Sequence, residues 1–229
     1  MQIENINGIM LEDTFRHKGL RERMCDGLRA KGITDEAVLT AMRTVPRHFF
    51  IEPPFDAFAY EDRALNIPCG QTISHPSTVA FQSQLLGVKK NDKVLEVGTG
   101  SGYQACVLAA MGARVLTIER HNDLYQKASQ LISSLKYFVR CYHGDGYKGI
   151  PASAPFDKII VTCGAPIVPP ELLVQLKIGG VMVIPVGDES YEMRRITRLS
   201  DTEISEETFG NFSFVPMLEK KQGTAKNFL

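Results

Sequence analysis

The stretch V94-L95-E96-V97-G98-T99-G100-S101-G102-Y103-Q104 joins a short apolar run to a helix-like run through a glycine-rich turn. Such a turn between a strand and a helix lies at the carboxyl edge of an open α/β sheet, where nucleotides commonly bind. A dinucleotide-binding turn of the G-x-G-x-x-G/A type needs glycine or alanine where Tyr103 stands. The pattern therefore predicts an adenosine-containing ligand, with a nicotinamide dehydrogenase as the less favoured alternative.

The residues that follow this turn predict the fold class. Apolar runs alternate with helical stretches from Asp92 to Gly187, as in "RVLTIE", "HNDLYQKASQLISSL" and "FDKIIVT". Short, continuous apolar runs of this kind are typical of parallel strands that are buried on both faces. We expect an α/β protein with a doubly wound, mostly parallel sheet.

The flanking segments predict additions to this sheet. Residues 11–50 predict two helices, the second opening at Thr34, and the proline-containing residues 51–70 predict an irregular segment. After Gly187, "MRRITRLS" and "FSFVPML" predict antiparallel edge strands. We expect one domain over residues 1–229, divided into a helical preamble with a substrate and cofactor loop (1–75), a cofactor-binding core (76–187), and edge strands with a tail (188–229).

The composition excludes several classes of partner. The 26 basic side chains equal the 26 acidic ones, so no basic surface for nucleic acid is expected. The apolar runs are too short to span a membrane, and "MQIENINGIM" lacks the pattern of a signal peptide. Five scattered cysteines without a C-x-x-C pair disfavour a disulfide framework and a zinc site. We therefore expect a cytoplasmic protein without a metal, nucleic-acid or membrane partner.

Acidic residues at predicted strand ends favour S-adenosylmethionine. The carboxylate of Glu96, expected to point into the crevice, would repel a pyrophosphate but complement an ammonium group and a sulfonium. Glu119 follows Gly98 at the spacing, about 20 residues, of an acid that accepts from both ribose hydroxyls. Asp145 is a candidate acceptor for the adenine amino group or a plain turn residue, and Gly146 allows close backbone approach.

Motifs outside the glycine turn identify the family. The chain contains, in order, "VPRHFF" (45–50), "AYEDRALNI" (59–67), "GQTIS" (70–74), "VLEVGTGSGYQACVLA" (94–109), "GDGYKG" (144–149), "FDKIIVTCGAP" (156–166), "LKIGGVMVIPVG" (176–187) and "FVPML" (214–218). Over about residues 15–218 it resembles the protein-L-isoaspartate O-methyltransferase family. The resemblance implies a Rossmann-like methyltransferase sheet with an N-terminal helical extension and antiparallel C-terminal edge strands.

The resemblance also implies a reaction. It implies methyl transfer from S-adenosylmethionine to the free α-carboxylate of L-isoaspartyl residues in damaged proteins and peptides. The products are S-adenosylhomocysteine and an ester that closes to a succinimide and leads to repair. A carboxylate with a pKa of about 4 is ionised at neutral pH, so neither a Ser-His-Asp relay nor a metal is needed. The preference between L-isoaspartyl and D-aspartyl residues stays open, and a monomer is expected.

The resemblance assigns roles to particular residues. It makes Ser74 the active-site residue, with a hydroxyl that orients the acceptor carboxylate. It places Val215 in a strand whose backbone could pair with an extended substrate. The expected cofactor-binding residues are Thr72, Ile73, Glu96, Gly98, Thr99, Gly100, Gly102, Glu119, Arg120, Asp145 and Gly146.

Several conspicuous side chains have structural interpretations. His75 precedes Pro76, where a helix can begin, so a capping or surface role is favoured over that of a base. Asp62 and Arg63 suggest an internal salt bridge or a loop clamp. Cys163 is expected to be a small core residue at a strand end.

Two alternative functions stay open. The first is a relative that methylates one aspartate of a dedicated biosynthetic peptide. The second is a non-catalytic adapter that only recognises isoaspartyl sites. The intact glycine turn and Glu119 argue against the adapter.

Overall fold

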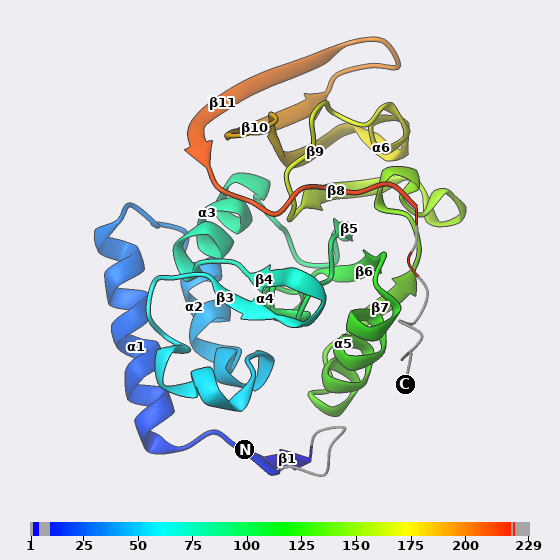
Figure 1. The fold of residues 1–229 in the computed structure, drawn as a ribbon. Coiled ribbons are helices and arrows are strands. Elements are labelled where there is room, and N and C mark those ends of the chain that lie inside the picture. Colours follow the sequence, from blue (N-terminus) through cyan, green and yellow to red (C-terminus); the bar gives the residue numbers. More distant parts are fainter. Residues whose placement is uncertain (1, 5–9, 221, 223–229) are drawn as a thin grey trace.

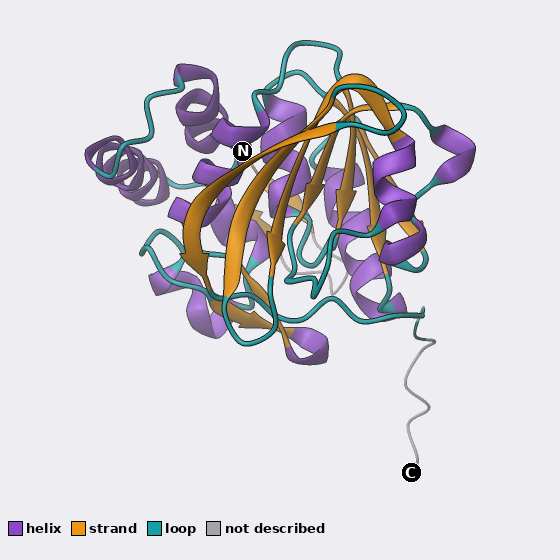
Figure 2. Ribbon diagram, turned by 90° about the horizontal axis from the view of Figure 1, so that it is seen from above, coloured by secondary structure: helices purple, strands orange, loops and turns teal. Residues whose placement is uncertain are grey.

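The protein is built around a seven-stranded sheet (Figures 1 and 2). A computed structural model describes residues 2–4, 10–220 and 222. Figure 2 shows the twisted sheet between helices on its two sides. The elements are β1 (Gln2–Glu4), β2 (Met10–Glu12), α1 (Phe15–Ala30), α2 (Glu36–Thr44), η1 (Arg47–Phe50), η2 (Pro53–Phe58), β3 (Leu65–Ile67), η3 (Pro68–Gly70), β4 (Gln71–Ile73), α3 (Pro76–Leu86), β5 (Lys93–Val97), α4 (Tyr103–Ala110), β6 (Arg114–Glu119), α5 (Asn122–Ser134), β7 (Val139–His143), η4 (Gly146–Lys148), η5 (Pro151–Ser153), β8 (Phe156–Val161), α6 (Pro170–Gln175), β9 (Leu176–Val186), β10 (Tyr191–Arg198) and β11 (Ile204–Phe212).

Buried apolar side chains explain why the central strands form. Strands β9, β8, β5, β6 and β7 are neighbours in that order and run parallel. Successive side chains of a strand face opposite sides of the sheet. Val94 accordingly lies in the core under α3, α4 and α5, whereas Leu95 lies in the core with Leu172 of α6. The predicted α/β class with a mostly parallel sheet is confirmed.

The antiparallel edge is confirmed, but one of its strands was assigned to the wrong residues. Strands β9, β10 and β11 pair antiparallel, and β11 ends at Phe212. The predicted strand "FSFVPML" begins at Phe212, the last residue of β11, and its residues 213–218 form an extended segment outside any strand. Strand β11 is exposed along most of its length, so it lacks the apolar alternation by which a strand is recognised. Of the predicted tail after Leu218, only residues 219, 220 and 222 are described.

The two N-terminal helices are present, with shifted starts. Residues 10–12 form β2, and α1 begins only after Thr14, whose side chain accepts a hydrogen bond from the His17 amide. Asp35, not Thr34, caps α2 because its carboxylate accepts from the amides of Ala37 and Val38. No helix in the described part of the chain is both long and apolar enough to cross a membrane.

The topology determines where a ligand can enter. The chain leaves β5 toward β6 and β7, and then returns to β8 on the other side of β5. Ligands of open α/β sheets bind outside the carboxyl ends of the strands at such a switch point. The glycine turn follows β5 at this point.

Candidate active site

The glycine turn is tightly packed against the end of β8. Gly98 has φ +98°, and a Cβ atom there would lie 2.6 Å from Oγ1 of Thr162. Thr162 Oγ1 donates to the carbonyl oxygens of Val97 (3.0 Å) and Gly98 (2.7 Å). At the end of the turn, a Cβ on Gly102 would lie 2.9 Å from Ile132. The turn therefore requires glycine for conformation and for space.

Two adjoining cavities open at this edge of the sheet. The first, of about 530 Å³, is lined by residues 71–74 and is called the loop cavity. The second, of about 440 Å³, is lined by residues 216–218 and is called the strap cavity. The two cavities share Gln71, Gly98, Glu119 and Cys163 in their walls, so together they form one elongated site.

Most of the predicted site residues lie at these cavities. Those that line the loop cavity are Thr72, Ile73, Ser74, Gly98, Thr99, Gly100, Glu119 and Val215. Those that line the strap cavity are Gly98, Glu119, Arg120 and Gly146. Glu96, Gly102 and Asp145 line neither of them.

Glu119 stands where the two cavities meet. It is the last residue of β6 and is only 5% exposed. Its two carboxylate oxygens accept hydrogen bonds from the amides of Gly100 and His121, each at 2.9 Å. These bonds orient the carboxylate while each oxygen keeps a further lone pair for a ligand.

Glu96 lies below the site, and the prediction that its carboxylate points into the crevice is wrong. The side chain is completely buried, and neither oxygen has a hydrogen-bond partner within the described residues. It faces the core side of β5, beside Thr117 in the paired strand β6. Burial, with the nearby negative charge of Glu119, raises the pKa of Glu96 to about 8. Glu96 is therefore largely protonated at neutral pH and cannot contact a ligand in the crevice directly.

Asp145, predicted to bind the cofactor with a turn role as the alternative, accepts hydrogen bonds from the backbone, as the alternative expected. Its Oδ1 accepts from the amide of Tyr147 at 3.0 Å, and its Oδ2 accepts from the amide of Lys220 at 3.1 Å. A Cβ on the neighbouring Gly146 would lie 2.6 Å from Val97, so glycine is needed there. Asp145 thus joins the end of β7 to the C-terminal segment.

That segment, residues 213–220, crosses the carboxyl edge of the sheet and is called the strap (Figure 1, orange to red). The carbonyl of Val215 accepts from the Gly164 amide at 2.9 Å, and the Met217 amide donates to the Gly164 carbonyl at 2.6 Å. The guanidinium of Arg120 donates to the carbonyl of Lys220 at 3.0 Å. Val215 therefore lies at the cavity but outside a strand, and its carbonyl is already bound to Gly164. The prediction of Val215 in a regular strand is corrected.

The loop beside the strap carries Ser74. Strand β4 pairs with β3, with Thr72 opposite Asn66 and Ile73 opposite Leu65. The Ser74 carbonyl accepts from Arg47 at 2.7 Å, whereas the Ser74 hydroxyl makes no hydrogen bond within the described part of the chain. A hydroxyl in the wall of the cavity is thus available to a ligand.

The neighbouring polar residues hold this loop in place. His75 occupies the N-cap position of α3, but its imidazole makes no capping hydrogen bond. Asp62 instead accepts from the amide of Ser77 at 2.8 Å and pairs with Lys31. Asp62 is therefore a loop clamp, and Arg63 pairs with Glu61 at 3.6 Å.

Sequence reasoning did not assign several residues of the cavity walls. Gln71 begins the "QTIS" run and lines both cavities, and Thr162 precedes Cys163 at the end of β8. Their places at strand ends beside the switch point could have indicated them. Cys163, predicted to be a small core residue, instead lines both cavities, and burial raises the pKa of its thiol to about 12, so it is a neutral wall residue.

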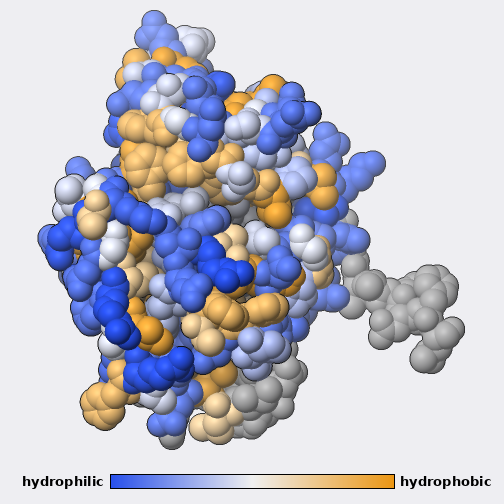
Figure 3. Space-filling model, turned by 60° about the vertical axis from the view of Figure 1, so that its left-hand side comes forward, coloured by the Kyte–Doolittle hydropathy of each residue, from blue (hydrophilic) through white to orange (hydrophobic). Residues whose placement is uncertain are grey.

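An apolar surface flanks the loop cavity. Phe81 of α3 stacks on Phe212 at 5.5 Å between ring centroids and meets Phe209 edge-on at 6.1 Å. Figure 3 shows an extended hydrophobic area on this side of the molecule, over α3 and the end of β11. Val79 of α3 and Val215 of the strap continue it into the cavity wall.

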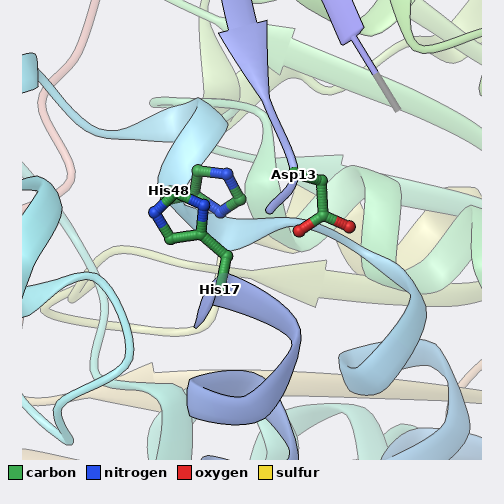
Figure 4. Close-up of side chains that lie close together, drawn as sticks. All are labelled: Asp13, His17 and His48. Carbon is green, nitrogen blue, oxygen red and sulfur yellow. The ribbon is translucent and has the colours of Figure 1, made fainter. Parts of the chain in front are cut away.

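A second cluster of ionisable groups lies outside the site (Figure 4). Potential ligand atoms of Asp13, His17 and His48 lie within 4.8 Å of one another. The two imidazole rings stack at 3.8 Å between centroids. Both oxygens of Asp13 accept from Arg21, and both ring nitrogens of His48 have partners, Tyr60 and the Glu12 carbonyl. These atoms are committed to holding the N-terminal segment, which leaves a poor site for a cation.

Comparisons with known proteins agree with this geometry. Residues 19–222 match the family model described as protein-L-isoaspartate(D-aspartate) O-methyltransferase. A Flavobacterium johnsoniae protein named protein-L-isoaspartate O-methyltransferase is 52% identical over 214 residues, which cover 92% of this chain and 100% of that protein. A protein of the same name from Christiangramia forsetii is 53% identical over 212 residues, with the same coverage.

Solved structures share the fold. A protein-L-isoaspartate O-methyltransferase structure superposes with a TM-score of 0.78 at 27% identity, over 86% of this chain and 65% of that one. A Plasmodium falciparum structure, solved in complex with S-adenosyl-L-homocysteine, gives a TM-score of 0.77 at 24% identity, over 86% of this chain and 98% of that one. The family match extends over the glycine turn, the Ser74 loop and the strap. The chain belongs to the protein-L-isoaspartate(D-aspartate) O-methyltransferase family.

Proposed function

We propose that the protein transfers a methyl group from S-adenosylmethionine to the free α-carboxylate of L-isoaspartyl residues in proteins and peptides. The elongated site carries this proposal. Glu119 separates a strap cavity suited to a nucleoside from a loop cavity in which the Ser74 hydroxyl is available to an acceptor. Membership of the family supports the choice of reaction.

The residues of the site fit S-adenosylmethionine. Glu119 is oriented to accept from ribose hydroxyls, and Ile118 and Met217 give the strap cavity apolar walls for an adenine ring. We assign Arg120 and Gly146 to the same cavity, and Gly98, Thr99 and Gly100 to the turn that approaches the ligand. When bound, S-adenosylmethionine supplies an electrophilic methyl group, whose bond to sulfur breaks as the acceptor oxygen bonds to carbon.

The protein's own contribution is to position the acceptor. We propose that Ser74 donates its hydroxyl hydrogen to one oxygen of the carboxylate, which leaves the other oxygen facing the methyl group. Thr72 and Ile73 form the adjacent wall. The carboxylate, with a pKa of about 4, needs no general base at neutral pH. Alignment of two bound reactants can lower a barrier by about 7 to 11 kcal/mol.

The acceptor is a residue within a polypeptide chain. Val215 and the apolar surface around Phe81 and Phe212 offer contact area for the segments that flank it. The neighbouring backbone nitrogen attacks the ester carbonyl carbon, methanol leaves with the amide proton, and the succinimide that results is hydrolysed in part to aspartate. We propose repair of damaged proteins as the outcome. D-aspartyl residues are a second candidate acceptor, and their rate of methylation is to be compared with that of L-isoaspartyl residues.

We further propose that the protein acts as a cytoplasmic monomer whose chain forms one domain. Cys25, Cys69, Cys106, Cys141 and Cys163 are all unpaired. Free thiols in this number are typical of a reducing compartment.

A paired-peptide assay tests the proposed function. The protein is incubated with methyl-labelled S-adenosylmethionine and either an isoaspartyl peptide or its ordinary aspartyl counterpart. Labelling of the isoaspartyl peptide alone, followed by a succinimide detected by mass, is expected. Equal labelling of both peptides would contradict isoaspartyl repair and favour a dedicated aspartyl substrate. Binding of S-adenosylhomocysteine without any transfer would favour an adapter.

A further inference from the structure

Arg47, in the "VPRHFF" motif, is a buried cation directly behind the loop cavity. It is completely buried in η1. Its Nε donates to the Ala59 carbonyl at 2.9 Å, and its Nη2 donates to the Ser74 carbonyl at 2.7 Å. Its guanidinium carbon lies 4.9 Å from the centroid of the Tyr103 ring. Both Ser74 and Tyr103 line the loop cavity, so the charge lies just behind its wall.

This charge has no counter-ion in the described residues. None of their ion pairs includes Arg47, and its Nη1 has no hydrogen-bond partner. Asp62, an acid that acts on it at longer range, is already paired with Lys31. Burial lowers the pKa of Arg47 to about 10, so the side chain remains charged at neutral pH. A buried charge that has carbonyl partners but no counter-ion is costly to keep, so a negative group in the adjoining cavity would stabilise it.

The loop cavity thus has a negative side and a positive side. Glu119 presents its carboxylate at the junction with the strap cavity, whereas Arg47 stands behind Ser74. A sulfonium beside Glu119 and a carboxylate beside Ser74 would each meet the opposite charge. The polarity of the cavity matches the two reactants of the proposed function.

We propose that Arg47 is a positioning residue for the acceptor: it holds the Ser74 peptide group and attracts the acceptor carboxylate into the loop cavity. The inference rests on the proposed function and deepens it. Methyl transfer converts the carboxylate into a neutral ester, so the attraction acts on the substrate and is lost with the product. Because the carboxylate also loses charge toward the transition state, Arg47 contributes to substrate binding more than to turnover.

Binding of two matched peptides tests this role. One peptide contains isoaspartate, and the other carries an α-carboxamide in place of the α-carboxylate. Their dissociation constants are measured by calorimetry with protein saturated with S-adenosylhomocysteine. The wild-type protein is expected to prefer the carboxylate by at least about tenfold. Arg47→Met should bring this preference close to one and raise KM for the isoaspartyl peptide more than it lowers kcat.

Two further variants separate charge from packing. Arg47→Lys keeps a cation but not the fork that reaches two carbonyls, so most of the preference should remain. Arg63→Met removes an exposed arginine from the neighbouring loop and should leave the preference unchanged. If Arg47→Met does not fold, Arg47→Gln, which keeps a polar side chain without the charge, replaces it, and the same loss of the carboxylate preference is expected.

Three results would overturn the role of Arg47. These are a wild-type protein without preference for the carboxylate, an Arg47→Met variant with the wild-type preference, and an Arg47→Lys variant that loses all of it. A wild-type protein that transfers no methyl group to the isoaspartyl peptide would instead overturn the proposed function. The methylation assay on the wild type therefore distinguishes the two failures.

Discussion

The ends of β5 and β6 carry two glutamates with opposite surroundings. Glu96 pairs in register with Thr117, so Glu119 lies on the same face of the sheet and two residues nearer its carboxyl edge. Two residues of strand correspond to about 7 Å. Over this distance the environment changes from the closed core to the junction of two cavities.

Because the two glutamates lie at different depths, one of them can bind a ligand, whereas the other affects only the stability of the fold. Glu119 receives two amide hydrogen bonds and faces the ligand site. Glu96 receives no hydrogen bond within the described residues and holds a proton at neutral pH. The first glutamate should therefore govern ligand affinity, and the second should govern stability as a function of pH.

The largest expected effect is the loss of ligand binding on removal of Glu119. Glu119→Ala deletes the proposed acceptor for the ribose hydroxyls and the partner of two loop amides. Affinity for S-adenosylhomocysteine should fall at least about 100-fold, about 3 kcal/mol, as measured by calorimetry. Glu203→Ala, at an exposed position, should leave the affinity unchanged. An unaltered affinity in Glu119→Ala would remove Glu119 from the site.

Glu96→Gln should change stability instead of binding. The unfolded carboxyl has a pKa of about 4.5 and the folded one about 8, so the folded state binds the extra proton between these values. The wild type consequently loses stability as pH rises from 4.5 to 8. Glu96→Gln, which cannot ionise, should gain about 3 kcal/mol in the free energy of unfolding at pH 7, since pH 7 lies 2.5 units above the unfolded pKa. Urea titrations across this pH range measure the gain.

The affinity of Glu96→Gln for S-adenosylhomocysteine should stay within about threefold of wild type, since the side chain does not reach the crevice. Glu203→Gln serves as the exposed control and should alter neither quantity. A large loss of cofactor affinity with unchanged stability would place Glu96 in the site after all.

A smaller effect, on kcat/KM, is expected at Ser74 in the loop cavity, where the methyl acceptor is proposed to bind. Ser74→Ala removes one hydrogen bond to a carboxylate that is already ionised. The value of kcat/KM for the isoaspartyl peptide should fall about tenfold, about 1.4 kcal/mol, while affinity for S-adenosylhomocysteine is kept. Loss of cofactor binding in this variant would show that Ser74 had been assigned to the wrong ligand.

The smallest effect is expected at His48, a buried base outside the ligand site. Burial shifts its pKa, as it does for Glu96, so His48 should also make stability depend on pH. Burial lowers the pKa of His48 to about 4, against 6.5 for an exposed histidine. The unfolded state therefore takes up a proton first as pH falls below 6.5, and stability decreases. From pH 7 to 5.5 this contribution should amount to about 1 kcal/mol. His48→Gln should lose that part of the pH dependence, and an identical pH profile would contradict the assignment.

Much of the fold was predictable because its determinants are contiguous. The apolar runs of the parallel strands and the turn from Gly98 to Gly102 lie within short stretches of sequence. The position of Glu119 at the end of its strand, beside the glycine turn, could be predicted from its spacing from Gly98 in the sequence. The depth of Glu96 could not, because moving a strand end by one or two residues decides whether a side chain faces the crevice or the core.

The rest of the site depends on contacts between distant segments. Thr162 holds the carbonyl of Gly98, and Arg47 holds that of Ser74. The strap is anchored to Gly164 rather than to a neighbouring strand. Neither the exposed edge strand β11 nor the extended strap has a periodic pattern of apolar residues. The last strand was therefore predicted over the strap instead of over β11.

A structure of the protein with S-adenosylhomocysteine and an isoaspartyl peptide tests the division of the site most directly. We predict that the ribose hydroxyls lie within hydrogen-bonding distance of Glu119, the adenine lies in the strap cavity, and the acceptor carboxylate contacts the Ser74 hydroxyl. A ribose held away from Glu119, or a peptide carboxylate bound outside the loop cavity, would contradict the account.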